Sequence, residues 1–120
     1  MPGLHILCVY NDKAFGAKSI PKLSDAGYQI TEADCALEAE RDFTKENYQA
    51  VVIGPGLVRF AKEELAIKAW ESGCAVVVVC SDKSDYTIQA DSHLALEKAE
   101  DKLAPEVLKV LTAKLCAVAG

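Results

Sequence analysis

The sequence reads Ala75-Val76-Val77-Val78-Val79-Cys80 at positions 75 to 80, and this run is the strongest strand signal in the chain. It is apolar at every position, so it lacks the alternation of a strand that has one face in water. Continuous apolar strands are typical of parallel sheets that helices cover on both faces. The run therefore predicts the central strand of an α/β sheet.

Four further strands are expected outward from this run, at residues 50–53, 28–33, 5–10 and, more weakly, 93–96. Apolar residues recur with helical spacing between them, over residues 12–27, 34–47 and 60–72 and onward from Pro105. The segment 81–92 is too short and too rich in turn residues for a full crossover helix. Strands that alternate with helices in this way predict a three-layer α/β/α sandwich around a parallel sheet.

The composition indicates the number of domains and makes nucleic-acid binding and membrane insertion unexpected. A chain of 120 residues, 51% of them hydrophobic, is typical of one compact domain, here residues 1–120. The net charge is −5 and basic residues form no stripe, so we expect no nucleic-acid binding. The longest strongly apolar run is far shorter than the roughly 20 residues that span a bilayer, and the start shows no secretion signal. We therefore expect a cytoplasmic protein without a membrane segment.

The cysteines favour a reduced protein. They are odd in number and widely spaced, and they form no CxxC pair and no cluster with histidine: Cys8, Cys35, Cys74, Cys80 and Cys116. Such spacing is not that of a disulfide framework or a zinc site. We expect mostly buried thiols, with no metal and no cofactor.

Three short motifs follow one another along the chain in a familiar order. Ile6-Leu7-Cys8-Val9 opens the first strand, Ala26-Gly27-Tyr28 precedes the second, and Pro105-Glu106-Val107-Leu108 lies in the last helix. Together with the spacing of the strands, they resemble the CheY-like receiver domain of bacterial response regulators over nearly the whole chain. The resemblance implies a flavodoxin-like sheet with strand order 2-1-3-4-5, here with the fourth helix shortened or missing.

The resemblance also implies which positions would form the phosphorylation site. Receivers carry an acidic pair after strand one, the phosphoacceptor aspartate after strand three, a hydroxyl residue after strand four and a lysine after strand five. The acids bind Mg²⁺ and the acceptor carboxylate is the nucleophile. Here those positions fall on residues without these groups: Tyr10, Asn11, Gly54, Cys80 and Leu96.

A shift of the alignment does not restore the nucleophile, because residues 47–62 contain no aspartate or glutamate. Ser81 would supply a hydroxyl if the alignment moved by one residue, and Lys98 lies two positions beyond Leu96. The resemblance therefore implies a pseudo-receiver: a module that is not an enzyme, cannot be phosphorylated and contacts proteins in two-component (phosphorelay) signal transduction.

The same edge of the sheet leaves an alternative open. Gly54-Pro55-Gly56 could converge its amides on an anion, although a tight turn explains the motif as well. With Asp12, Ser81 and Asp82, Gly56 would form a weak ligand edge. The alternative is a small flavodoxin-like protein that binds an anionic metabolite there.

The acidic residues after Cys80 allow two interpretations. Asp82, Asp85 and Asp91 could form a displaced cation site beside Asp12, or an ordinary solvated loop in which aspartates cap turns. We expect the solvated loop and no metal.

A helical face is the expected contact surface, either for a protein partner or for self-association. The helix over residues 12–27 and the helix from Pro105 onward are the best candidates. Phe60 and Trp70 are expected in the core. The mixed-sign run Lys62-Glu63-Glu64 is expected to be solvated.

Overall fold

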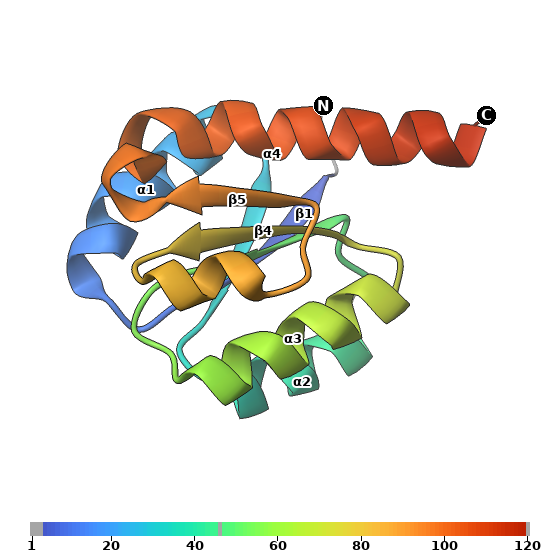
Figure 1. The fold of residues 1–120 in the computed structure, drawn as a ribbon. Coiled ribbons are helices and arrows are strands. Elements are labelled where there is room, and N and C mark those ends of the chain that lie inside the picture. The colour runs from blue at the N-terminus through green and yellow to red at the C-terminus, as the bar shows by residue number, and fades with distance from the viewer. Residues whose placement is uncertain (1–3, 46, 120) are drawn as a thin grey trace.

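Five parallel strands form the central layer of the molecule (Figure 1). The structure is a computed structural model that describes residues 4–45 and 47–119. The strands follow the order β2-β1-β3-β4-β5, with β1 at His5–Val9, β2 at Gln29–Ala33, β3 at Ala50–Ile53, β4 at Ala75–Cys80 and β5 at Ser92–Ala95. The predicted α/β fold and strand order are confirmed.

Helices cover both faces of the sheet. They are α1 at Lys13–Asp25, α2 at Ala36–Lys45, α3 at Arg59–Glu71 and α4 at Leu96–Ala119, with a short 3₁₀ helix, η1, at Lys83–Thr87. Figure 1 shows α1 and α4 on one face and α2 and α3 on the other. The helix predicted to be shortened or missing is present as η1, a five-residue element between β4 and β5.

The apolar run of β4 is explained by two cores. Every residue of β4 is buried, and alternate side chains point to opposite faces of the sheet. Val77 and Val79 pack with residues of α1 and α4, whereas Val76 and Val78 pack with residues of α2 and α3. Because both faces are covered, no position of the strand can be polar without losing contacts.

The last helix begins earlier than predicted. It starts at Leu96, which was expected to end the fifth strand, and Pro105 lies inside it instead of at its start. The reason is a buried stripe that begins before the proline. Ala99, Leu103 and Val107 are four residues apart and fully buried against the α1 side of the sheet.

Helix α3 overturns two expectations. Its buried stripe is Lys62, Leu65, Ala66 and Ala69, so Lys62 is not solvated. Phe60 and Trp70, which were expected in the core, lie off that stripe, and their exposed fractions are 70% and 55%.

The thiols follow the prediction in part. Cys8, Cys74 and Cys80 are free and buried, and Cys35 is free but exposed; the side chain of Cys116 lies outside the described residues. No helix in residues 4–45 and 47–119 combines the length and the apolar character needed to cross a lipid bilayer.

Candidate functional site

The positions that the receiver resemblance assigns to a phosphorylation site lie at one edge of the sheet. Val9 pairs with Ile53 and Cys80 with Ala95. The residues that follow β1 and β3, the last residue of β4 and the first of α4 therefore lie along the carboxyl edge, where α/β sheets build their sites. These residues are Tyr10, Asn11, Gly54, Cys80 and Leu96. Lys98, the alternative lysine, is an exposed residue near the start of α4.

The side chain of Tyr10 fills the space beside Gly54. A Cβ atom added to Gly54 would lie 2.8 Å from the Cβ of Tyr10 and 3.0 Å from Cε2 of Phe15. Contacts this short require a neighbour to shift. Gly54 is not among the glycines with positive φ, so its backbone conformation does not demand glycine. The lack of space explains why this position carries no side chain.

Three contacts hold the Tyr10 ring in place. It meets the Phe15 ring edge-on, with centroids 5.2 Å apart. Its hydroxyl donates a hydrogen bond to Oε1 of Glu32. A Cβ atom on Gly16 would lie 2.6 Å from this hydroxyl, so a second glycine leaves room for the ring. Partial burial and the Glu32 carboxylate raise the pKa of Tyr10 above its ordinary value, so the phenol stays protonated at neutral pH.

The Gly54-Pro55-Gly56 segment is a tight turn fastened to β1. The amide of Gly54 donates to the Val9 carbonyl at 2.8 Å, and the amide of Asn11 donates to the Pro55 carbonyl at 2.9 Å. Gly56 has a φ of 94°, and a Cβ atom there would lie 1.9 Å from the Asn11 carbonyl oxygen. Close approach of the two backbones therefore requires glycine at position 56.

A buried ion pair occupies the end of β4, and sequence reasoning missed it. Nζ of Lys62 lies 3.1 Å from both carboxylate oxygens of Asp85. Oδ2 of Asp85 also accepts from the amides of Ser81 at 3.0 Å and Asp82 at 3.2 Å. Burial acts to raise the pKa of Asp85, but the Lys62 ammonium and the two amides outweigh it and hold the pKa below its ordinary value.

This ion pair changes the chemistry of the proposed ligand edge. The amides of Ser81 and Asp82 are the donors that an anionic metabolite would need, and the carboxylate of Asp85 already accepts from them. Asp12 is also engaged, since its Oδ1 accepts from the amide of Phe15 at 3.0 Å and caps α1. These contacts do not favour an anion site here.

The acidic residues after Cys80 do not come together as a cation site, and the expected solvated loop is wrong for Asp85, which is buried. Asp85 pairs with Lys62, whereas Oδ2 of Asp91 accepts from the amide of Val76 at 2.7 Å, near the opposite end of β4. A different group, Asp34, Cys35 and Glu38, brings three possible metal ligands within 4.8 Å of one another among the described residues. All three are exposed, and such surface groups are common without an ion.

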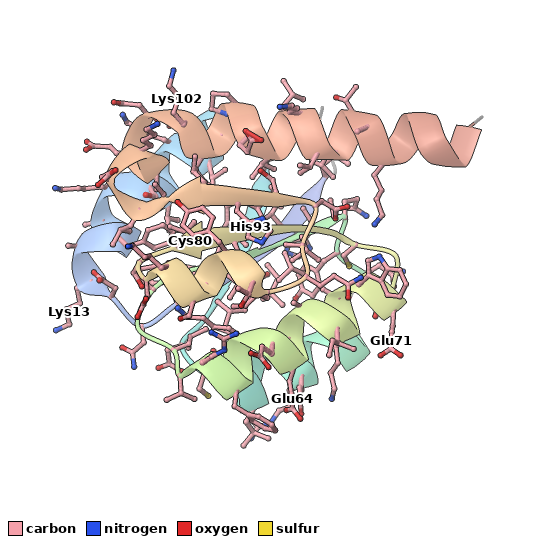
Figure 2. All side chains as sticks on the ribbon, viewed as in Figure 1. Lys13, Glu64, Glu71, Cys80, His93 and Lys102 are labelled. Atoms are coloured by element: carbon pink, nitrogen blue, oxygen red, sulfur yellow. The ribbon has the colours of Figure 1, made fainter. Side chains whose placement is uncertain are left out.

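The thiol of Cys80 is not activated. It is buried, and burial together with the Asp85 carboxylate raises the pKa of Cys80 to about 11. A thiol with this pKa is protonated at neutral pH and is a poor nucleophile. Figure 2 shows Cys80 inside the molecule, whereas Lys13 points away from it.

A cleft of about 600 Å³ opens on the other side of Tyr10, between α1 and the ends of β2 and β1. Its lining carries four carboxylates and one ammonium: Asp12, Glu32, Asp34, Glu38 and Lys13. An acidic lining repels an anionic metabolite. This cleft therefore also argues against the metabolite alternative.

Comparison with solved structures agrees with the strand order. A CheY-like receiver domain protein from Methanospirillum hungatei has a TM-score of 0.81 and 19% identity, covering 95% of this chain and 98% of the other. The fold is that of receiver domains. The receiver domain of an HD domain-containing protein from Pseudomonas fluorescens has a TM-score of 0.81 and 13% identity, covering 97% and 92%.

A third similar structure was solved in complex with Mg²⁺ and BeF. The response regulator TrrA from Thermotoga maritima, in complex with Mg²⁺ and BeF, has a TM-score of 0.76 and 19% identity, covering 89% of this chain and 98% of the other. No protein-family model matches the sequence, and no curated protein matches it. At these identities the receiver likeness describes the fold.

Proposed function

We propose that this chain is a cytoplasmic pseudo-receiver, a non-phosphorylatable module that acts through protein contacts in two-component signal transduction. The observation that carries the proposal is the Tyr10 side chain beside Gly54. The nucleophile is absent from the place that receivers give it, and the Tyr10 and Phe15 side chains leave no room to restore it.

The lack of available oxygen ligands for Mg²⁺ at the carboxyl edge of the sheet supports the same proposal. Mg²⁺ needs several oxygen ligands in near-octahedral geometry. The carboxylate nearest the former acidic pair is that of Asp12, and it already caps α1. Without a metal and an acceptor carboxylate, the edge has neither the charge compensation nor the nucleophile that phosphoryl transfer requires.

The contacts of η1 further support a module with one stable arrangement. Besides the Lys62–Asp85 pair, Arg59 of α3 donates from Nη1 to the Ser84 carbonyl at 3.2 Å and from Nη2 to Oγ1 of Thr87 at 2.6 Å. In the receivers that this chain resembles, the region after strand four changes on phosphorylation. Here it is fastened to α3, so we propose that its protein contacts are constitutive.

Phosphorylation can be tested directly on the intact protein. Acetyl phosphate with Mg²⁺ is expected to leave the intact mass and the amide spectrum unchanged, while a working receiver domain in the same buffer gains a phosphoryl group. The Gly54→Asp variant is expected to stay unmodified as well, because its partner acids are missing. A phosphoryl adduct on the wild-type chain, or amide shifts at Asn11, Gly54 and Cys80, would overturn the proposal.

A further inference from the structure

Helix α3 is apolar on two opposite sides. One side carries the buried stripe that faces the sheet, including Leu65 and Ala69. The other carries Phe60 and Ile67, and Trp70 lies on the flank between the two sides; their exposed fractions are 70%, 51% and 55%. A helix that is apolar all round is normally buried all round. Nothing in the described part of the chain covers the outer side of α3.

The outer residues of α3 repeat with a period of seven. Phe60 and Ile67 are seven residues apart, as are Glu64 and Glu71, and Trp70 is three residues beyond Ile67. In the heptad of two packed helices, Phe60 and Ile67 take position a, Trp70 takes d, and Glu64 and Glu71 take the flanking position e; the first d position is Glu63. We call the five residues other than Glu63 the α3 seam. Figure 2 shows Glu64 and Glu71 pointing away from the sheet.

The charge of the α3 seam is negative, and the Lys68 ammonium is near enough to interact with both glutamates without forming an ion pair with either. The basic residues of α3 are engaged elsewhere: Arg59 lies 2.6 Å from Glu63, and Lys68 lies 2.8 Å from Glu40 of α2. Within the described part of the chain, Glu64 and Glu71 form no ion pair. The seam thus offers two acidic side chains beside three exposed apolar ones.

The two helices that were expected to form the contact surface, α1 and α4, offer no comparable apolar cluster, and α2 and η1 expose one large apolar side chain each among the described residues, Leu37 and Tyr86. The large hydrophobic side chains exposed among the described residues include none on α1 and only Leu108 on α4. The sequence-based expectation placed the contact face on these two helices. The apolar surface lies instead on α3.

We propose that the α3 seam binds an amphipathic helix of a partner protein, with apolar residues at i, i+3 or i+4 and i+7 and with lysine or arginine opposite Glu64 and Glu71. The inference rests on the proposed role as an interaction module and assigns its surface. A second copy packed antiparallel is disfavoured, because it places glutamates against glutamates, and a parallel copy would offer Glu64 only Arg59, which Glu63 already holds. A partner helix with basic flanks fits both the spacing and the charge.

Trp70 provides the readout, because it is the only tryptophan of the chain. The probe is a helical leucine–lysine peptide of about 14 residues, or four turns. The controls are a leucine–glutamate peptide with the same apolar pattern and a scrambled leucine–lysine peptide. The amphipathic basic peptide is expected to shift Trp70 emission to the blue and to move the amide signals of residues 59–71, and the two controls are not.

Variants locate the binding. Trp70→Ala is expected to weaken binding of the labelled basic peptide at least about tenfold by fluorescence anisotropy, as for a central interface tryptophan. Glu64→Lys with Glu71→Lys is expected to transfer the preference to the acidic peptide. Leu108→Ala removes an equally exposed side chain from α4 and is expected to change nothing.

Three results would overturn the assignment: equal binding of the scrambled peptide, amide shifts centred away from α3, or a homodimer that Trp70→Ala dissociates in sedimentation. None of these measurements involves phosphate. If these measurements fail, the α3 seam is not the contact surface. The phosphorylation test of the proposed function is independent of that result.

Discussion

Tyr10 and Gly54 act as a complementary pair, one large and one small. Gly54→Ala adds a single methyl group at a backbone conformation that alanine can adopt. Because this Cβ atom would lie 2.8 Å from the Cβ of Tyr10, the substitution is expected to destabilise the protein by about 1–3 kcal/mol, the usual cost of overpacking. Urea unfolding followed by circular dichroism measures the change.

The control is a double-mutant cycle. In a Tyr10→Gly background, Gly54→Ala should cost less, since the Cβ atom that lies 2.8 Å away is gone and only the contact with Phe15 remains. An equal cost in both backgrounds would show that Tyr10 does not set the size of the residue at position 54.

Lys62 and Asp85 form a second residue pair that is important for stability. The exposed fractions of their side chains are 5% and 3%. Lys62→Met keeps most of the apolar stem and leaves a buried carboxylate without its cation. The expected loss is about 3–5 kcal/mol of unfolding free energy. Lys68→Met, on the exposed side of the same helix, breaks a half-exposed pair with Glu40 and should cost far less, because solvent screens such a pair. Similar losses for the two variants would contradict this account.

The Asp85 carboxylate also predicts a dependence on pH. Its pKa in the folded state is held below the ordinary value of 3.8, so its contribution to stability is present above that value and disappears as the pH falls through the lower, folded-state pKa. The stability difference between wild type and Asp85→Asn should therefore be constant above about pH 5 and shrink below pH 3.8. Unfolding curves between neutral and acidic pH provide the measurement, and a difference that grows on acidification would refute it.

At the scale of elements, η1 is stabilised more by its contacts with α3 than by hydrogen bonds within the short helix itself. A five-residue 3₁₀ helix has few internal hydrogen bonds, and here Lys62 and Arg59 supply the anchoring contacts. In hydrogen exchange, Lys62→Met should accelerate the amides of residues 81–87 while those of β1 and β3 stay protected. Uniform acceleration over the whole chain would instead indicate global destabilisation.

The elements also show which parts of the fold could be predicted from the sequence and which could not. The strands were predictable because runs such as 75–80 are apolar at each position, a pattern that both covered faces of the sheet require. The early start of α4 was hidden, because the charges of residues 97–102 lie on the same helical turns as the buried Ala99 and Leu103. The regular four-residue spacing of Ala99, Leu103 and Val107 was the signal from which the early start of α4 could have been predicted.

The position of the candidate site could be predicted from the sequence, but the side-chain contacts within it could not. Strand order alone places Tyr10, Gly54 and Cys80 at one edge. That Tyr10 fills this edge depends on where its ring points, and that Lys62 pairs with Asp85 depends on how η1 packs on α3. Lys62 does share the helical spacing of Leu65, Ala66 and Ala69, so its burial was visible in principle.

For the whole molecule, a net charge of −5 should speed the approach of a basic partner to the α3 seam. Stopped-flow Trp70 fluorescence with the leucine–lysine peptide should show an association rate that falls steeply with salt and a dissociation rate that changes little, because the apolar contacts are not screened. A salt effect confined to dissociation would contradict long-range steering.

The contact between Tyr10 and Gly54 also bears on the history of such a protein. An aspartate introduced at position 54 must displace the Cβ of Tyr10 and the Phe15 ring, and a smaller residue at position 10 loses the contacts with Phe15 and Glu32. Each single step toward an acidic residue at this edge therefore passes through a less stable protein. Selection for stability alone would preserve the pair.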